Sequence, residues 1–546
     1  MRSAVLLALL AGALALPGAA HAARFAVGVA PGSQAEALAA RLEAKTGGRA
    51  SVIGPFAVSL RAKSPREIRG TLGVSYVERL GGARKIAFAP TDPFFVRQWY
   101  VQAVRGFDAW ALRPTLPGMR VAVIDSGIDA SHPEFKGRIA GYKSFVGGSA
   151  LKDTQGHGTF VAGLIAARID NQEGIAGLAF PAQLLVAKVV RYDGVVPLEA
   201  EARAIRWAVD HGARVINLSL GGMRDPFDAS RDSYSPLEAS AVAYAIRRGA
   251  VVVAAVGNGD QAPEQPWRYA SYPAALPHVL GVSALTDTGS VPSFSNRDRI
   301  YNDIAAPGLR ILSILPRPLT ARYPSCSEQG YSSCGPDEYR EAEGTSFAAP
   351  QVAAAAAVLL SLHPTLRPEQ VTRTLQSTAV DLTAANGCTA CGEGRDAYSG
   401  WGRLDVEAAI SALAKHVPAR DFYEANDDVG ARAYNTVYGS NRRLRAEVDF
   451  WDDQDDVYAI KLARNQPVYV GLTDSDRSID LGLALWLPQT GSIENVGDSR
   501  FRVRTSARTG SRQYLSYRAP RTGTYYIQVR MSSPGVTRYR LAIVKG

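Results

Sequence analysis

The sequence predicts an α/β fold, a parallel sheet with helices on both faces, preceded by a small α/β unit and followed by an all-β sandwich. Between about residues 91 and 415, apolar β-branched runs alternate with helical stretches, which is typical of a parallel sheet covered on both sides. After about residue 416, short alternating runs between turn residues indicate an antiparallel sandwich. Because side chains with chemical roles gather at the carboxyl ends of parallel strands, we expect functional residues there.

Residues 1–22 have the pattern of a secretory signal peptide. Arg2 precedes an apolar stretch over residues 4–16, and the sequence AHA at residues 20–22 follows as a cleavage site. The apolar stretch is too short to span a membrane comfortably, and no later stretch is long and apolar enough to be transmembrane. We therefore expect cleavage after Ala22 and secretion to the periplasm or the extracellular space.

Residues 23–87 predict the small α/β unit. Strand-like runs at residues 24–30 and 51–60 flank a helical stretch that begins near Ser33 and ends at Gly47. Because the unit lies between an export signal and a larger domain, it has the position of a pro-segment.

Residues 88–415 are expected to contain the parallel sheet. Runs rich in Val, Ile and Leu predict buried strands, and stretches of helical periodicity lie between several of them. The expected strands cover residues 120–125, 183–190, 214–220, 251–257 and 278–284, and the expected helices cover residues 157–168, 197–212, 235–249 and 347–362.

Residues 416–546 predict the sandwich, with no compelling internal repeats. The acidic run DFWDDQDD at residues 449–456 could bind a cation, although a solvated turn is the role we expect for it. The expected strands cover residues 456–462, 467–473, 481–487, 514–519, 524–530 and 539–544.

Composition gives little support to a nucleic-acid partner. The chain has 546 residues, 46% of them hydrophobic and 21% charged, which is ordinary for roughly two to four globular domains. The formal net charge is +10, but the basic residues are mostly scattered arginines. Solubility explains this charge, and no nucleic-acid-binding motif accompanies it.

The cysteines lie in two close pairs, and export makes disulfides possible. Sequence alone permits three connectivities, of which we expect local pairing of Cys326 with Cys334 and of Cys388 with Cys391. A four-cysteine zinc site and a redox role for the second pair are the alternatives. The spacing, the export and the lack of a thioredoxin-like pattern favour disulfides.

The stretch EGTSFAAP at residues 343–350 makes Ser346 either a nucleophile or only a helix-capping residue. The Ala-rich run that follows predicts a buried helix with Pro350 in its first turn, and serine is common at helix starts. The same placement exposes the hydroxyl to the field of a helix N-terminus, which stabilises developing negative charge. A serine nucleophile needs a base, which the rest of the chain must supply.

His157 and Asp125 are the candidates for the base and its carboxylate partner. His157 lies between two glycines at a helix start, whereas the other histidines lie in the signal, in turns or at element ends. Asp125 ends an apolar strand, where it could fix the tautomer of an imidazole. Asn258, flanked by Gly257 and Gly259, could aim its amide at an oxyanion. Taken singly, each residue also has a purely structural explanation: His157 as a loop histidine, Asp125 as a strand-end cap and Asn258 as a turn residue.

The order Asp125, His157, Asn258, Ser346 matches the order of the subtilisin arrangement. The blocks VIDSGID, GHGTFVAG, INLSLGG, VGNG and GTSFAAP resemble the signature blocks of the subtilase family over about residues 91–415. The resemblance implies a subtilisin-like fold and a serine endopeptidase, a hydrolase. The histidine in GHGT argues against the related sedolisins, which use a glutamate there.

The resemblance also implies a role for each of these residues. Ser346 would attack the scissile carbonyl, and His157 would accept its proton and pass it to the leaving amine. Asp125 would orient His157. The side-chain amide of Asn258 and the backbone N–H of Ser346 would form the oxyanion hole.

The resemblance further implies a cleft that binds an extended peptide as an added strand. No acidic residue matches the pattern of relatives that cut after basic residues, so we expect broad specificity with an apolar or small residue before the cut. The insertion at residues 311–340 could border the cleft and narrow this specificity. The expected substrate-binding residues are Ser219, Leu220, Gly221 and Gly222 on one wall, Ala255, Val256 and Gly257 on the other, and Ser271 in the first specificity pocket.

A structural calcium ion is a family expectation. The loop at residues 169–177 resembles the calcium-binding loop of subtilisin and thermitase, and oxygen ligands suit a hard cation. An ordinary polar surface loop is the alternative. The implied ligands are the side chains of Asp92, Glu134 and Asn171 and the backbone carbonyls of Glu173 and Ile175.

The resemblance suggests maturation by a cut near Ala87 or Phe88, with the pro-domain as an inhibitor-like chaperone. The C-terminal region resembles pre-peptidase C-terminal domains through DFYEANDD, DVYAIKL and GTYYIQV. We expect a monomer that acts on protein or peptide substrates. A processing protease for one partner and a non-catalytic binding protein are the other hypotheses; the last would need a missing catalytic group, and the sequence has none missing.

Overall fold

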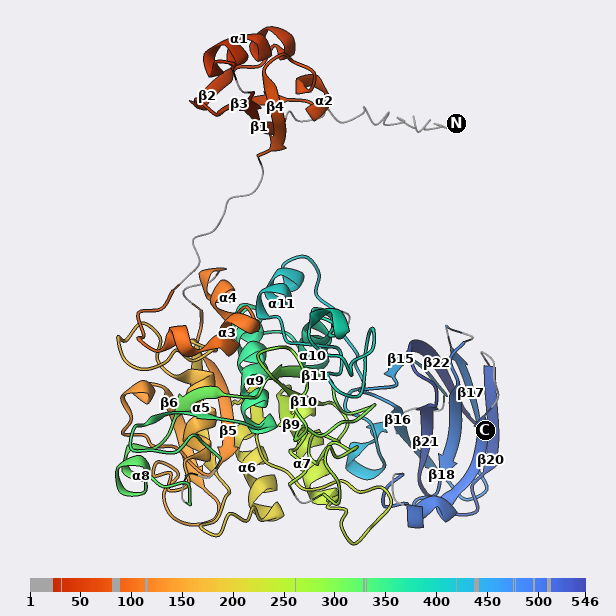
Figure 1. The fold of residues 1–546 in the computed structure, drawn as a ribbon. Helices are drawn as coiled ribbons and strands as arrows, with labels where there is room; N and C mark the ends of the chain where they lie inside the picture. Colours follow the sequence, from red (N-terminus) through yellow and green to blue (C-terminus); the bar gives the residue numbers. More distant parts are fainter. Residues whose placement is uncertain are drawn as a thin grey trace, which may run out of the picture. The chain divides into compact units, whose positions relative to one another are not determined.

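The computed structural model describes residues 23–30, 32–80, 89–112, 116–260, 262–327, 329, 331–418, 420–436, 441–474, 476, 478–493, 496–507 and 512–546. The expected signal peptide and the expected cut near Ala87 or Phe88 lie outside these residues. The chain divides into two compact units, Met1–Ile86 and Ala87–Gly546, whose elements are labelled in Figure 1.

The first unit is an antiparallel sheet with the order β2-β3-β1-β4, covered by a helix. Leu38 and Leu42 of the helix pack on Phe25, Val27 and other buried residues of the sheet. The single strand expected over residues 51–60 is instead a pair of strands joined by a turn. The elements are β1 (Ala23–Val29), α1 (Ala35–Thr46), β2 (Ala50–Gly54), β3 (Ala57–Ala62), α2 (Pro65–Ile68) and β4 (Val74–Arg79).

The second unit is built on a seven-stranded sheet with the order β11-β10-β9-β8-β5-β7-β6, in which all neighbours are parallel. This confirms the expected parallel sheet; the two edge strands, β6 and β11, were not expected. The strands are β5 (Met119–Asp125), β6 (Ile139–Ser144), β7 (Ala182–Lys188), β8 (Val215–Leu218), β9 (Val251–Ala255), β10 (Val279–Leu285) and β11 (Ile304–Pro307).

Helices cover both faces of this sheet, as expected (Figure 1). Alternate residues of β5 enter two different cores, Val121 and Val123 the one beneath α5 and α9, Ala122 and Ile124 the one beneath α6 and α7. The helices of this part are η1 (Phe95–Arg97), α3 (Trp99–Ala103), α4 (Gly106–Leu112), η2 (Pro133–Phe135), α5 (His157–Ala166), α6 (Leu198–Asp210), α7 (Pro236–Arg247), α8 (Arg317–Arg322), α9 (Thr345–Leu362), α10 (Pro368–Ser377), η3 (Ala384–Asn386) and α11 (Val406–Leu413).

The helix α9 is apolar because it is a core element. By length and composition it is long and apolar enough to cross a membrane, but 89% of it is buried inside the protein. It begins at Thr345, two residues earlier than expected, so Pro350 lies inside the helix and not in its first turn. Gly344 is the residue at the N-cap position, so the interpretation of Ser346 as a cap is wrong.

The C-terminal part is a sandwich of a five-stranded sheet, β14-β16-β21-β18-β19, and a four-stranded sheet, β15-β22-β17-β20. Leucine, valine, isoleucine and tyrosine side chains of both sheets form its core. The elements are η4 (Gly430–Arg432), β14 (Tyr434–Asn435), β15 (Asn441–Asp449), β16 (Asp455–Leu462), β17 (Pro467–Asp474), β18 (Leu481–Trp486), η5 (Val496–Phe501), β19 (Arg502–Ala507), β20 (Arg512–Arg518), β21 (Gly523–Met531) and β22 (Val536–Lys545).

The acidic run at residues 449–456 is not a solvated turn. It ends β15, turns and begins β16, and Asp453 and Asp455 are each 7% exposed while Asp456 is fully buried. Asp453 faces His278 of the preceding domain, whereas Asp455 and Asp456 accept hydrogen bonds from Gln528 and Tyr539 of the sandwich. These contacts join residues far apart in the sequence, so no local pattern could indicate them.

Each expected cysteine pair is joined by a disulfide. Cys326 bonds Cys334 and Cys388 bonds Cys391, with a Cα–Cα distance of 5.3 Å in each pair. The first disulfide closes a loop within the long insertion, whose ends form an antiparallel pair, β12 (Ile311–Ile314) and β13 (Tyr339–Ala342). Because all four sulfurs are used, the zinc alternative is wrong.

Candidate active site

Ser346 stands near the start of the long central helix. It is the second residue of α9, where backbone N–H groups without helical partners point toward the site. Its Oγ atom donates a hydrogen bond to the carbonyl oxygen of Ser219 at 3.2 Å. Ser219 directly follows β8, so the hydroxyl lies beside the carboxyl end of a central strand, where the parallel sheet predicts functional residues.

A proline inside α9 helps to fix this serine. Pro350 has no N–H, so the carbonyl of Ser346, four residues earlier, loses its helical hydrogen bond. The hydroxyl of Ser219 replaces that bond and donates to the Ser346 carbonyl oxygen at 2.7 Å. Nδ2 of Asn217 donates to the Ser219 hydroxyl in turn, at 2.9 Å. The serine is thus held by both its side chain and its backbone.

His157 and Asp125 meet although they lie far apart in the sequence. His157 begins α5 and Asp125 ends β5. Nδ1 of the imidazole lies 2.9 and 3.0 Å from the two carboxylate oxygens. The carboxylate is 2% exposed and the imidazole 25% exposed, so the imidazole alone reaches solvent. Burial lowers the pKa of His157, but the charge and hydrogen bond of Asp125 outweigh burial and raise the pKa above 6.5.

Asp153, which the sequence analysis did not single out, holds the loop that carries the imidazole. Its buried carboxylate accepts hydrogen bonds on both sides of His157, so the loop has little freedom. An Asp a few residues before a glycine-rich turn is a common acceptor for backbone N–H groups, and that signal could have found it. The donors are the backbone N–H groups of Gln155, Gly156 and Thr159 and the hydroxyls of Ser126 and Thr159.

Asn258 presents a defined end of its amide. Its Oδ1 atom accepts hydrogen bonds from the backbone N–H and the hydroxyl of Thr345, both at 2.9 Å. These two bonds leave Nδ2 as the group that can donate toward a ligand. Asn258 and Ser346 line the same pocket, so an oxygen bound there could receive the amide hydrogen.

A pocket of about 200 Å³ opens beside Ser346. Of the expected substrate-binding residues, Leu220, Gly221, Ala255, Gly257 and Ser271 line it. Lining residues that were not expected are Met223, Asp260, Trp267 and Asn296.

Two of the expected substrate-binding residues have other roles. The side chain of Val256 is fully buried, so this residue can offer only its backbone. The backbone of Gly222 exchanges two hydrogen bonds of 2.9 Å with Tyr272, so its N–H and carbonyl groups are already paired and are not available to a substrate strand.

A second pocket, of about 560 Å³, lies on the imidazole side of the cleft. Asp125, His157 and Leu220 line it together with Ser327 and Tyr331 of the disulfide-closed insertion. The ring of Tyr331 packs edge-on against the imidazole, with 5.8 Å between the ring centres, and its hydroxyl donates to the carbonyl of Gln155 at 3.2 Å. The insertion therefore borders the cleft.

The expected calcium residues also come together. Asp92 and Glu134 are fully buried, and Asn171 donates its side-chain amide to Glu134 at 3.0 Å and its backbone N–H to Asp92 at 3.3 Å. Ile175 donates its N–H to Glu134 at 2.9 Å, whereas the side chain of Glu173 is exposed. Burial raises the pKa of Glu134 to about 7, and the charge of Asp92 adds to this effect.

Known proteins are similar to this chain over its central part. The model of the Subtilase family matches residues 117–402. Subtilisin DY of Bacillus licheniformis is 36% identical over 53% of this chain and 90% of its own. Thermitase of Thermoactinomyces vulgaris is 35% identical over 50% of this chain and 86% of its own. A solved structure of proteases from Pseudoalteromonas arctica covers 59% of this chain and 99% of its own at 27% identity, with a TM-score of 0.48.

The matched residues span half of the chain and contain Asp125, His157, Asn258 and Ser346. The chain therefore belongs to the subtilase family and is a subtilisin-like serine endopeptidase.

Proposed function

We propose that the chain is a secreted endopeptidase that cuts peptide bonds with Ser346 as nucleophile, His157 as general base and acid, and Asp125 as the residue that orients His157. The observation that carries this proposal is the pairing of a buried carboxylate with the inner nitrogen of a partly exposed imidazole. That pairing leaves Nε2 for the serine proton and stabilises the imidazolium that forms. Without substrate, the Ser346 hydroxyl bonds to the carbonyl of Ser219. The catalytic hydrogen bond between a serine and its histidine often forms well only when substrate is bound.

The oxyanion of the tetrahedral intermediate would bind to Nδ2 of Asn258 and to the backbone N–H of Ser346. Support comes from the Thr345 bonds, which hold the oxygen end of the amide away from the ligand. The N-terminus of α9 adds a favourable dipole for the same charge. Removing one such donor from a subtilisin costs about 10²–10³ in kcat.

The residue before the cut would be apolar or small. The pocket beside Ser346 is walled by Ala255 and Asn296, both buried, so its inner part carries no charge. Asp260 also lines this pocket but is exposed, which puts its carboxylate at the open end. A panel of peptides that differ only at this residue tests the proposal; preference for arginine that disappears in Asp260→Asn would contradict it.

A specialised processing protease is the second candidate function, and Tyr331 is the observation that favours it. The disulfide-closed insertion sets this side chain against the imidazole, where it narrows the space for the substrate residues ahead of the cut. Tyr331→Ala should broaden the set of peptides that are cut. Cleavage of peptides that carry glycine at the substrate position beside Tyr331 should change little. An unchanged peptide profile would favour the broad-specificity enzyme.

A calcium ion would have a structural role in the second unit. The residues fit: the group offers oxygen donors, and two buried carboxylates of like charge need a cation. Asp92, Glu134, Asn171 and the backbone of Glu173 and Ile175 would hold it. The ion would neutralise these carboxylates and tie the segment before α3 to the loop at residues 169–177. Glu134→Gln should reduce the rise in Tm that calcium gives, by the part that this site contributes.

The chain would be made as a zymogen and mature after export. Support comes from the signal pattern at residues 1–22 and from the small folded unit whose described residues end at residue 80. This unit would act as the chaperone and inhibitor of the enzyme until self-cleavage near Ala87 or Phe88.

One experiment tests nucleophile and maturation together. Purified wild type and Ser346→Ala are compared by intact mass and by casein hydrolysis. We expect the wild type to lose the segment before about Phe88 and to digest casein, while the variant stays full-length and inert. If the variant matures and digests like the wild type, Ser346 is not the nucleophile. If both mature and neither digests casein, another protease performs maturation and the specificity is narrow.

A further inference from the structure

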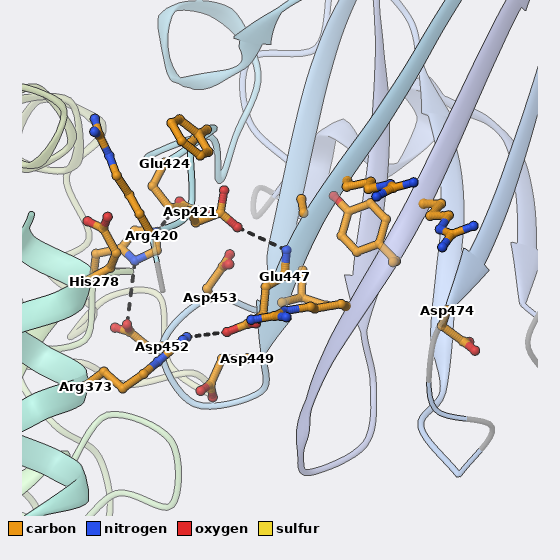
Figure 2. A pocket seen from close by; sticks show the side chains of 18 of the residues that line it. His278, Arg373, Arg420, Asp421, Glu424, Glu447, Asp449, Asp452, Asp453 and Asp474 are labelled. Carbon is orange, nitrogen blue, oxygen red and sulfur yellow. Dashed lines mark hydrogen bonds and ion pairs between the residues drawn. The ribbon is translucent and has the colours of Figure 1, made fainter. Parts of the chain in front are cut away.

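One histidine and three carboxylates meet where the C-terminal sandwich packs on the subtilase domain. Figure 2 labels His278, Glu424 and Asp453 of this group. His278 precedes β10 of the subtilase domain. Glu424 and Asp427 belong to the segment that enters the sandwich, and Asp453 lies in the turn between β15 and β16. One nitrogen or oxygen atom from each of the four side chains lies within 4.8 Å of those of the other three.

The four side chains are buried together. The side chains of His278 and Glu424 are 6% and 5% exposed, Asp427 is 10% exposed, and residue Asp453 is 7% exposed. Nε2 of His278 lies 2.8 Å from a carboxylate oxygen of Glu424 and 2.8 Å from one of Asp427. Even a fully protonated imidazole cannot balance three ionised carboxylates, and the side chains are mostly buried, so an excess negative charge there would be costly.

Two carboxylate oxygens in this group lack a donor. Among the described residues, Oε1 of Glu424 and Oδ1 of Asp453 have no hydrogen-bond partner, and the contact of Oε2 of Glu424 is with Nε2 of His278. Oδ1 of the fully buried Asn426 also lacks one, while the amide of Asn426 donates to Asp456. Burial, and after it the charge of Glu424, raises the pKa of Asp456. All of these atoms are acceptors. Buried acceptors without donors point to a bound cation, because a buried oxygen that binds nothing is costly.

The arginines nearby supply only part of the missing charge. Arg247 and Arg432 lie close enough to Asp427 to interact with its charge, but the ion pair of Arg432 is with Asp428. A cavity of about 770 Å³ beside the cluster is lined by further arginines, but Arg373 and Arg538 both pair with Glu447. Figure 2 shows this separation, with Arg373 turned to Glu447 and away from Glu424. Among the described residues, no arginine or lysine forms an ion pair with Glu424, Asp427 or Asp453.

We propose that His278, Glu424, Asp427 and Asp453 bind a divalent metal ion that joins the sandwich to the subtilase domain. The spacing suits such an ion, since ligand atoms about 2.0–2.6 Å from a metal lie no more than about 5 Å apart. One imidazole nitrogen with carboxylate oxygens is a donor set that Zn²⁺ and Mn²⁺ accept. Ca²⁺ would draw on the carboxylates and on the unpaired amide oxygen of Asn426.

The position of the site gives it a mechanical role. Its nitrogen ligand comes from the subtilase domain and its oxygen ligands from the sandwich and the segment leading into it, so the ion holds two domains together. When the ion leaves, the carboxylates repel one another and the junction loosens. The segment from residue 420 to residue 436, which contains Arg420 and Arg432, then becomes open to trypsin.

Metal content of the full-length chain tests the site. The Ser346→Ala chain, used so that it stays intact, is stripped with EDTA, incubated separately with Ca²⁺, Zn²⁺ or Mn²⁺, desalted and analysed for bound metal. We expect the Ser346→Ala chain to bind one more equivalent of at least one of these ions than the same chain carrying Glu424→Gln or Asp453→Asn binds. Asp476→Asn, an exposed carboxylate of the sandwich, is the matched control and should bind the full amount.

The bridge between the domains is tested with His278→Gln and with trypsin. We expect this variant to lose the ion and, with it, the protection from cleavage at Arg420 and Arg432 that the ion gives the reference chain. Ion binding that survives in His278→Gln would overturn the bridge. Equal metal content in the reference chain and both carboxylate variants would overturn the site.

A further variant keeps the test decisive if the carboxylate variants do not fold. Glu134→Gln removes the other group of candidate cation ligands and leaves the cluster around His278 intact. In this chain the ions should still bind and raise Tm. If none of the three ions binds to it or raises its Tm, the proposal is wrong, whatever the outcome for the activity of Ser346.

Discussion

Two buried groups in this protein each combine a histidine with carboxylates, and they differ in how the carboxylates are satisfied. Around His157, the oxygens of Asp125 and Asp153 accept hydrogen bonds from N–H and O–H groups of the protein. Around His278, the carboxylates lie close together, and among the described residues Oε1 of Glu424 and Oδ1 of Asp453 have no hydrogen-bond partner. The difference teaches that a protein can hold buried negative charge with its own donors, as in the first group, or leave it to a cation.

The largest effect should come from removing the charge that orients His157. Asp125→Asn keeps the size of the side chain but not its charge, and the amide can hold the imidazole in the wrong tautomer. A loss of about 10⁴ in kcat is expected, the size seen for this change in another triad protease. Kinetics on a peptide ester and amide measure it. A loss below tenfold would mean that Asp125 only caps its strand.

Neutralising one carboxylate in each group should change stability in opposite directions. Asp153→Asn leaves backbone N–H groups without an acceptor and should lower the free energy of unfolding by about 1–3 kcal/mol. Asp453→Asn removes a buried negative charge that the protein does not balance, so it should raise Tm in EDTA at pH 8.

Denaturant unfolding of both variants in the Ser346→Ala chain measures whether each substitution raises or lowers the free energy of unfolding. The comparison fails if Asp453→Asn is destabilising in EDTA to the same extent as Asp153→Asn. Asp476→Asn, which alters an exposed carboxylate, is the control for the general effect of the substitution.

The pH profile should report the raised pKa of His157. Because the base must be neutral, kcat/KM falls as pH drops through this pKa, and the acid limb should have its midpoint above pH 6.5. Since Asp125 is what outweighs burial, the residual activity of Asp125→Asn should have its acid limb at lower pH. A midpoint below 6.5 in the wild type would mean that burial dominates over the carboxylate.

The smallest effect should come from a third buried acidic pair, Glu201 of α6 and Glu238 of α7. Burial raises the pKa of Glu238 to about 7 and that of Glu201 well above its usual range, so the folded protein holds protons that the unfolded chain releases. The stability from this pair is present below about pH 4.5 and is lost as pH rises through 7. Glu201→Gln keeps the hydrogen bond without titrating and should stabilise the chain at pH 8 by on the order of 1 kcal/mol.

Unfolding of wild type and Glu201→Gln between pH 4 and pH 9 measures this effect. Stability curves that stay parallel over the whole range would contradict the pairing. Glu407→Gln, a partly exposed carboxylate on α11, serves as the control.

Most of the fold was predictable because hydrophobic periodicity is a local property. The central strands β5, β7, β8, β9 and β10 are continuous apolar runs, and the sequence analysis found them all. The edge strands β6 and β11 were missed: β6 is half-exposed and lacks such a run, and β11 has only four residues. The start of α9 was misplaced because a proline inside a helix looks like a first-turn proline until the partner of the freed carbonyl is known.

The sequence by itself determined the parallel sheet and the four residues proposed for catalysis, and it favoured the local pairing of the cysteines, since each depends on a local pattern or a short spacing. Only the tertiary structure decided which groups face each other across the chain. It brought Asp153 to the loop of His157, set Tyr331 against the imidazole and occupied the backbone of Gly222. It also buried the acidic run beside His278. The physical reason is that burial and charge balance depend on contacts between residues far apart in sequence, which no local pattern encodes.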